Sequence, residues 1–353
     1  MNGGDGFGVY VHIPFCASKC DYCAFATWTD RAHLMDQYLA AVEREIERAE
    51  LPAATSVFVG GGTPSLVPPE RLAALIATIP VVEGAEITVE CNPDNVDSAL
   101  TTTYASAGVN RISLGVQSMV PEVLERLGRR HDRDNVAAAV DAIQTAGLPT
   151  FNLDLIYGTV GESDDDWRST LEQVLELDPP HISAYALTVE AGTPLAERRA
   201  DHPDDDVQAD RYEIVDDTLS AAGLLGYEIS NWAKPGHECR HNGLYWAQGD
   251  YRGFGCAAHS HSAGRRWWNV RTPDRYIDLV AQGASTEAAG EELDEETRRF
   301  EGLELRLRTR EGVPLDRLDG EALPGIVEQR GDRWVLTRRG RLMANEVSTH
   351  LIV

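Results

Sequence analysis

Six short β-rich runs recur through the first 188 residues of the chain, and each is followed by a helix-like segment. The runs cover residues 9–13, 56–59, 86–91, 111–116, 151–157 and 182–188. Strands that alternate with helices in this way form parallel β/α units. Six such units predict an α/β fold, a partial (β/α)6 barrel that resembles part of a TIM barrel.

The segments between the runs carry the marks of helices. Residues 34–49 (LMDQYLAAVEREIERA) are amphipathic, and residues 69–79 open with a proline, which suits the first turn of a helix. Residues 164–177 open with three aspartates, and negative charge is favourable at a helix N-terminus. These features support the crossover helices that parallel strands require.

Two further regions follow the predicted barrel of residues 1–225. Residues 226–287 form an extension of the barrel, in which residues 226–262 are rich in glycine and histidine, lack clear periodicity and are interpreted as ordered loops. A helix is expected over residues 273–282. The last region, residues 288–353, is expected to be a small α/β domain that resembles a winged helix.

The winged-helix-like domain is expected to begin with an acidic linker over residues 288–296. A helix over 297–307, a strand over 333–337 and a final helix over 339–351 complete it. Such domains often bind DNA, and five arginines make this one locally basic: Arg330, Arg333, Arg338, Arg339 and Arg341. Because the whole chain has a net charge of -25, a structural or docking role is the favoured interpretation.

In barrels of this kind the chemistry lies in the loops after the carboxyl ends of the strands. The unusual residues of this chain fall there. A cysteine-rich loop follows the first run, and GGGTP (60–64) follows the second. ECNPD (90–94) ends the third, GVQS with Gln117 ends the fourth, and Asp154 lies within the fifth.

Three cysteines in the loop HIPFCASKCDYCAFA form the pattern C-x-x-x-C-x-x-C, with Cys16, Cys20 and Cys23. Structural zinc is usually held by four ligands, and electron-transfer iron–sulfur clusters are usually held by four thiolates. A 4Fe–4S cluster on three thiolates leaves one iron free to bind a substrate. The alternative is a zinc loop completed by His12, His33 or Cys91. Cys239 and Cys256, like Cys91, are otherwise interpreted as isolated structural thiols.

This loop, with the strand before it, resembles the cluster motif of radical S-adenosylmethionine (SAM) enzymes. In that superfamily the methionyl group of SAM binds the open iron, and reduction yields a 5'-deoxyadenosyl radical. The resemblance implies that GGGTP receives the methionine amino group and that the carboxylates of Glu90 and Asp154 face the cationic cofactor. It also implies that Gln117 binds the ribose and Arg129 binds the methionine carboxylate.

More closely, the chain is similar to the oxygen-independent coproporphyrinogen III oxidase-like family. VYVHIPFC, GGGTPS, ECNPD, RISLGVQS, DLIYG, SAYALTVEAGT and GYEISNWA carry this resemblance over almost the whole chain. It implies a 4Fe–4S cluster on the three cysteines. The residues that it places at the cluster and SAM are Tyr10, Phe25, Gly61, Gly62, Thr63, Glu90, Gln117, Arg129 and Asp154.

Two functions share this radical core. The resemblance implies that true coproporphyrinogen III dehydrogenases carry an extra cysteine two positions after the third cluster cysteine, where this chain has Phe25. They also carry a longer segment before the first strand. The HemW-type haem chaperone branch has an H-N-x-x-Y-W motif, present here as HNGLYW with His241.

The resemblance to this branch implies haem contact by His241, and histidine is a common axial ligand of haem iron. His237, Cys239 and His259 are alternative ligands. The leading hypothesis is a haem chaperone that delivers haem to recipient proteins, respiratory ones in particular. The alternatives are an oxygen-independent coproporphyrinogen III dehydrogenase, which would make the chain an enzyme, and a zinc-bound regulator. A homodimer is plausible from the family.

The composition of the chain limits the classes of partner that it can bind. A net charge of -25 argues against nucleic acid and anionic lipid as general partners. The chain has no apolar run of the eighteen or more residues that span a bilayer, and its first residues, MNGGDGFG, lack the regions of a signal peptide. A cytoplasmic protein with no integral membrane segment is expected.

Overall fold

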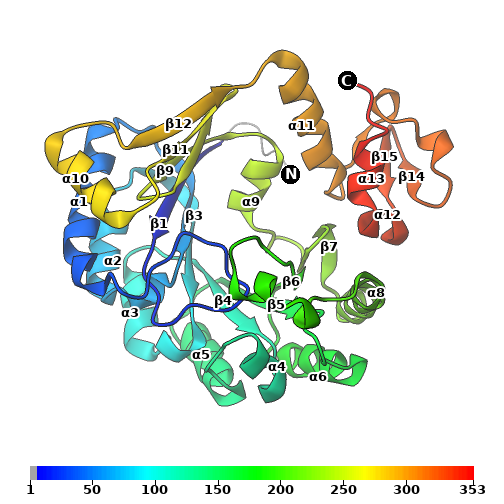
Figure 1. The fold of residues 1–353 in the computed structure, drawn as a ribbon, viewed down its shortest axis with the longest axis horizontal. Helices are drawn as coiled ribbons and strands as arrows, with labels where there is room; N and C mark the ends of the chain where they lie inside the picture. Colours follow the sequence, from blue (N-terminus) through cyan, green and yellow to red (C-terminus); the bar gives the residue numbers. More distant parts are fainter. Residues whose placement is uncertain (1–5) are drawn as a thin grey trace.

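The computed structural model describes residues 6–353 (Figure 1). The expectation that the N-terminus is no signal peptide concerns residues 1–8, of which residues 1–5 lie outside the described part. No helix of residues 6–353 is long and apolar enough to cross a membrane.

Six parallel strands form the centre of a twelve-stranded sheet, as the sequence predicts. They lie side by side in chain order. Their bounds are Phe7–Ile13 (β1), Ala54–Gly61 (β2), Val81–Cys91 (β3), Arg111–Gln117 (β4), Thr150–Tyr157 (β5) and His181–Ala186 (β6). The partial (β/α)6 barrel is therefore confirmed.

Helices cover the outer face of these strands (Figure 1). They are Met35–Arg48 (α1), Pro69–Ile76 (α2), Ser98–Ser106 (α3), Arg133–Thr145 (α5), Asp164–Leu175 (α6) and Asp205–Ala221 (α8). Two short helices, Pro121–Arg126 (α4) and Pro194–Glu197 (α7), instead belong to a separate apolar cluster beside Tyr22 of the cysteine loop. The predicted acidic start of α6 is present, and Ser163 completes a capping box with Asp166.

The strands alternate between an apolar outer face and a polar inner face. In β1, Val9, Val11 and Ile13 are fully buried in the core beneath the helices, whereas Tyr10 and His12 line an internal pocket. Because each parallel strand repeats this alternation, the apolar core lies between sheet and helices. The barrel interior is left to polar side chains.

Additional strands extend both edges of the parallel sheet. Leu225–Glu228 (β7) and Asn231–Ala233 (β8) follow β6, while Asp250–Phe254 (β9) pairs parallel with β1. His259–Ser262 (β10), Arg265–Asn269 (β11) and Glu287–Glu292 (β12) continue beyond β9. The last strands, β12 and β7, are not paired with each other, so the barrel is open.

The prediction of ordered loops over residues 226–262 is wrong. This stretch holds β7 to β10 and one helix, Arg240–Trp246 (α9), so the HNGLYW motif lies on a helix instead of a loop. A helix, Pro273–Gln282 (α10), follows β11 at the predicted residues and packs on α1.

The predicted linker over residues 288–296 is also wrong for most of its length. Glutamates of β12 face arginines of the neighbouring strand β11: Arg265 pairs with Glu287 and Glu292, and Arg266 pairs with Glu291. The acidic segment is an edge strand because these cross-strand charges are opposite.

The C-terminal domain has its own small apolar core and a three-stranded sheet. Its elements are Glu295–Leu307 (α11), Val313–Pro314 (β13), Val327–Arg330 (β14), Arg333–Leu336 (β15), Arg338–Leu342 (α12) and Ala344–Ser348 (α13). The predicted final helix is divided in two at Met343. Arg338 and Arg341 bind Asp216 of α8, so two of the five arginines dock the domain on the barrel.

Candidate functional site

The loop after β1 presents the three predicted cysteines. Cys16, Cys20 and Cys23 are all partly exposed free thiols. The loop folds back on its own base, where Trp28 N–H donates to Pro14 O at 2.8 Å and Cys16 N–H donates to Trp28 O at 3.1 Å. The thiols are thus held on a closed, anchored loop at the carboxyl end of the barrel.

The glycine segment after β2 packs directly against this loop. Gly62 N–H donates to Ile13 O at 2.7 Å and Thr63 N–H donates to Phe15 O at 2.8 Å. A Cβ atom on Gly62 would lie 2.6 Å from Phe15 O and 3.0 Å from Cys16 Sγ, so only glycine fits. The Thr63 hydroxyl lies 3.7 Å from Cys16 Sγ. The predicted GGGTP segment therefore touches the cysteine loop.

Two partly buried carboxylates, Glu90 and Asp154, face the barrel interior beside this segment. Burial, and after it the nearby Asp154, raise the pKa of Glu90 to about 7, while burial raises the pKa of Asp154. Asp154 accepts hydrogen bonds from Ser113 Oγ at 2.8 Å and Asn152 Nδ2 at 2.7 Å. No ion pair to either carboxylate occurs among residues 6–353. A bound cation would offset the free-energy cost of holding the negative charge of these carboxylates away from water.

Arg129 extends from the segment after α4 toward the same site. Its Nη2 donates to Gly115 O at 2.6 Å and Asn92 Oδ1 at 2.8 Å, and its Nη1 lies 3.6 Å from Cys20 Sγ. Its Nε is buried without a hydrogen-bond partner. A buried donor without a partner has a high desolvation cost, so this N–H is available to a bound anion.

Gln117 ends β4 with a φ of 66°, the left-handed region that residues other than glycine rarely adopt. The strand is also irregular there, because the register with β5 shifts between Gly115 and Gln117. Backbone strain of this kind is concentrated at functional sites. The side chain of Gln117 is buried at the same end of the barrel.

The zinc alternative gains no support from two of its expected fourth ligands, His12 and Cys91. Both ring nitrogens of His12 are engaged, Nδ1 with Tyr10 Oη at 3.0 Å and Nε2 with Ala26 O at 2.9 Å. Cys91 is buried in the core beneath the helices, away from the barrel interior that Glu90 faces. Over residues 6–353, no three side chains of His, Cys, Asp or Glu converge on a position for a single metal ion.

Helix α9, which carries HNGLYW, lies against the inner face of the barrel. Glu86 of β3 accepts the backbone N–H of Arg240 at 3.1 Å and that of His241 at 3.0 Å, which anchors the first turn. His241 is 0% exposed, and its ring stacks on Phe58 of β2. Its Nδ1 bonds Ser56 Oγ and its Nε2 bonds Tyr245 Oη, each at 2.8 Å.

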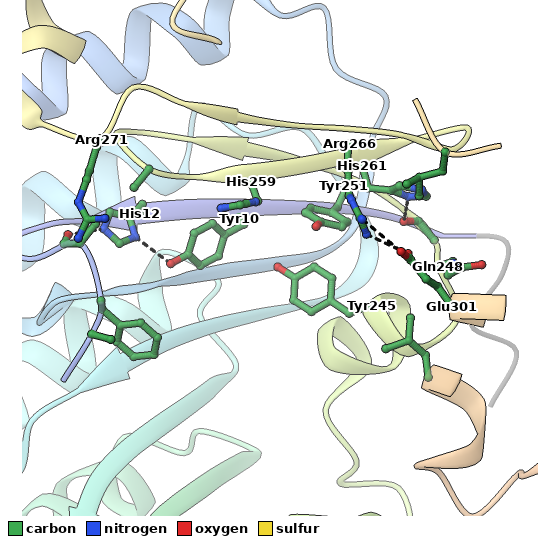
Figure 2. A pocket seen from close by; sticks show the side chains of 17 residues that line it. Tyr10, His12, Tyr245, Gln248, Tyr251, His259, His261, Arg266, Arg271 and Glu301 are labelled. Atoms are coloured by element: carbon green, nitrogen blue, oxygen red, sulfur yellow. Dashed lines mark hydrogen bonds and ion pairs between the residues drawn. The ribbon is translucent and has the colours of Figure 1, made fainter. Parts of the chain in front are cut away.

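A pocket of about 660 Å³ lies between β1, the β9–β11 strands, α9 and α11. Figure 2 shows Tyr10 and His259 near its middle, with Arg271 beside His12 at one end and Arg266 beside Glu301 at the other. Ala24, Phe25 and Ala26 of the cysteine loop also line it. The pocket thus connects the cysteine loop with the HNGLYW helix, and its volume is typical of a ligand site.

Comparison with known proteins identifies the family. The model of the radical SAM superfamily matches residues 10–174. A protein of Mycobacterium tuberculosis H37Rv named heme chaperone HemW is 44% identical over 99% of this chain and 95% of its own length. The chain belongs to the HemW family. Relatives of the same name from Escherichia coli K12 and Bacillus subtilis are 36% and 34% identical, each over 96% of this chain and over 96% and 97% of their own lengths.

The fold of the HemW family is shared with another porphyrin-related protein. The solved structure of coproporphyrinogen III oxidase (HemN) from Escherichia coli superposes with a TM-score of 0.85 over 98% of this chain and 90% of that chain. The sequence identity is 23%, so this likeness concerns the fold alone.

Membership of the radical SAM superfamily implies a 4Fe–4S cluster and SAM, and the residues present fit both. Three partly exposed thiols share one anchored loop. Two partly buried carboxylates suit a cationic cofactor, and the Arg129 Nε is free to bind an anionic group. Gly61, Gly62 and Thr63 bring backbone close to the loop.

Several residues at this HemW-family site were missed by the sequence interpretation. Asn92 and Ser113 position Arg129 and Asp154, and Asn152 also binds His181. Every second side chain of a predicted strand points into the barrel, and this period could have identified them. The pocket residues Tyr251 and Arg271 gave no such signal, because the strands that bring them together were not predicted.

Proposed function

We propose that this chain is a haem chaperone with a radical SAM core, which takes haem as cargo and delivers it to haem proteins. The observation that carries the proposal is the sequence identity of 34–44%, over essentially the full length, to proteins named heme chaperone HemW. Phe25, where an oxidase of the family would carry a cysteine, supports the same choice.

In this proposal Cys16, Cys20 and Cys23 hold the 4Fe–4S cluster, and SAM binds its open iron. Tyr10, Phe25, Gly61, Gly62 and Thr63 surround the cofactor from the pocket wall, the cysteine loop and the glycine segment. Glu90 and Asp154 balance its positive charge, while Gln117 binds the ribose and Arg129 the methionine carboxylate.

Haem contact by the HNGLYW helix remains part of the proposal. Tyr245 lines the pocket, and His241 holds the Tyr245 hydroxyl through its Nε2. Iron binding by His241 would require this hydrogen bond to break. The helix is therefore proposed to act on haem mainly through the pocket wall that it builds.

Respiratory haem proteins as recipients, a homodimer and a cytoplasmic location are proposed on family grounds. The charge of the chain supports haem proteins over nucleic acid as partners. The five arginines of the C-terminal domain do not change this, because three of them are in ion pairs: Arg330, Arg338 and Arg341.

The test begins with anaerobic reconstitution of the full chain with iron and sulfide. Haem is titrated while the Soret band is followed, and a parallel sample receives SAM, a strong reductant and coproporphyrinogen III. We expect saturable haem binding and no protoporphyrinogen over many turnovers. Sustained production of protoporphyrinogen would establish the oxidase instead, and absence of haem binding would overturn the chaperone.

A further inference from the structure

We propose that haem binds in the pocket of Figure 2 with His259 as its iron ligand and Arg271 as the partner of one propionate. The inference rests on the proposed function and names its binding site. It differs from the motif-based expectation, which assigned the iron to His241.

The histidines around the pocket differ in the availability of their ring nitrogens. His12 and His241 have both nitrogens in hydrogen bonds. His261 uses Nδ1 on Gly249 O at 3.0 Å and is 7% exposed. The ring nitrogens of His259 have no hydrogen-bond partner among residues 6–353, and the residue is exposed. A neutral imidazole with a free nitrogen is what haem iron requires.

The position of His259 is fixed by the sheet. In β10 it lies opposite Trp268 of β11, and the two rings stack with centroids 5.6 Å apart at 29°. Figure 2 shows its ring beside Tyr10, near the middle of the pocket. Partial desolvation of the ring, followed by the charge of Arg266, lowers the pKa of His259, which favours the neutral imidazole. A ligand held by a strand and a stacking partner is oriented before iron arrives.

The walls of the pocket suit a flat, largely apolar macrocycle. Tyr245 and Tyr251 contribute aromatic rings, and neither residue is among those proposed to contact SAM. Aromatic side chains pack well on such a ligand because they combine large apolar area with few rotatable bonds.

The two arginines that line the pocket are not equivalent. Arg266 is fully engaged, with Nη1 and Nη2 on Glu301 at 2.9 and 3.1 Å and Nε on Glu291. Arg271 is exposed, and no carboxylate of residues 6–353 pairs with it. A guanidinium without an ion pair at the end of the pocket is suited to a carboxylate ligand, and haem carries two propionates.

The experiment uses the full chain titrated with ferric haem, with absorption and electron paramagnetic resonance spectra of wild type, His259→Ala and His259→Gln. We expect both variants to lose the histidine-ligated signature and to bind haem at least about tenfold more weakly, since even residues that only support a metal ligand contribute that much. Imidazole added to His259→Ala should restore the spectrum. His33→Ala, which removes an exposed histidine outside the pocket, should behave as wild type.

A second comparison tests the propionate. Arg271→Ala should weaken haem binding without changing the ligand spectrum, and it should reduce the preference of the protein for haem over haem dimethyl ester. Arg275→Ala removes an exposed arginine of α10 that does not line the pocket, and it should leave this preference intact.

The outcomes separate the inference from the proposed function. If wild type binds haem with a histidine signature and His259→Ala keeps it while His241→Ala loses it, the His259 assignment is overturned and the chaperone stands. If wild type binds no haem, the proposed function fails. An unchanged haem preference in Arg271→Ala removes the propionate assignment.

Discussion

Glu90 Oε2 accepts a hydrogen bond from the Gly61 N–H at 2.9 Å, which joins the end of β3 to the glycine segment after β2. The same segment hydrogen bonds to the base of the cysteine loop through Gly62 and Thr63. One carboxylate is thus connected through two backbone contacts to the loop that presents the cysteines. Changes at Glu90 should therefore affect both stability and cofactor binding.

The partly buried carboxyl of Glu90 makes stability depend on pH. Its pKa is raised to about 7 in the folded chain, so the folded state holds this proton more tightly than the unfolded state. The contribution is fully present below the ordinary glutamate pKa and is lost as the pH rises through about 7. At about 1.4 kcal/mol per pKa unit it is on the order of 3 kcal/mol at most.

Glu90→Gln should remove this dependence. The difference in unfolding free energy between wild type and Glu90→Gln, measured by chemical denaturation of the cofactor-free protein, should fall between pH 5 and pH 8. The variant should also bind SAM more weakly. A difference that stays constant across this range would show that Glu90 does not titrate as described.

Gly62→Ala should disturb the cysteine loop. The added Cβ would meet two backbone oxygens, Phe15 O at 2.6 Å and Ile13 O at 2.9 Å, which cannot move independently. We expect a loss of about 1–3 kcal/mol of stability and a reduced cluster content, measured as iron and sulfide per chain. Gly84→Ala is the control. A Cβ atom added at Gly84 would meet no other atom within 4 Å, although the residue has a positive φ. This substitution should therefore cost about 1 kcal/mol of stability and leave the cluster content unchanged.

Replacement of a loop thiol should abolish the cluster. Cys20→Ala leaves two thiolates, which are too few to retain the cluster. The absorbance of the cluster at about 400 nm should therefore be missing after the same reconstitution. Cys256→Ala removes a fully buried thiol that lies near Tyr38 and should retain the absorbance. Full cluster absorbance in Cys20→Ala would contradict the assignment of the three cysteines.

The C-terminal domain depends on one buried carboxylate of α8. Asp216 accepts from Trp232 Nε1 at 3.0 Å and pairs with Arg338 and Arg341 at 2.8 and 3.2 Å. Asp216→Ala should lower the unfolding free energy by about 3 kcal/mol and expose the domain to limited proteolysis. Asp217→Ala removes an exposed partner of Arg338 and should cost less than about 1 kcal/mol. Equal effects of the two variants would exclude this docking role.

The six parallel strands could be predicted because their apolar runs and crossover helices are local features of the sequence. The edge strands could not. β12 has the sequence EAAGEE and is exposed along its whole length, so nothing in its own residues indicates a strand. Its partners, Arg265 and Arg266, lie more than twenty residues earlier in the chain.

Helix α9 was missed for a related reason. It is seven residues long, contains a glycine and an asparagine, and has no capping side chain of its own. The carboxylate that satisfies its first backbone N–H groups belongs to Glu86, more than 150 residues earlier. The motif could be recognised from sequence, whereas the enclosure of His241 depends on contacts that only the fold creates.

Transfer of haem tests the central claim most directly. The reconstituted chain is loaded with haem, freed of excess and mixed with an apo haem protein, and the Soret band of the recipient is followed in time. We predict that the recipient gains haem in proportion to the amount loaded, faster than from buffer containing the same free haem concentration. If the chain retains its haem, or if transfer is no faster than from free haem, the proposed chaperone function is contradicted.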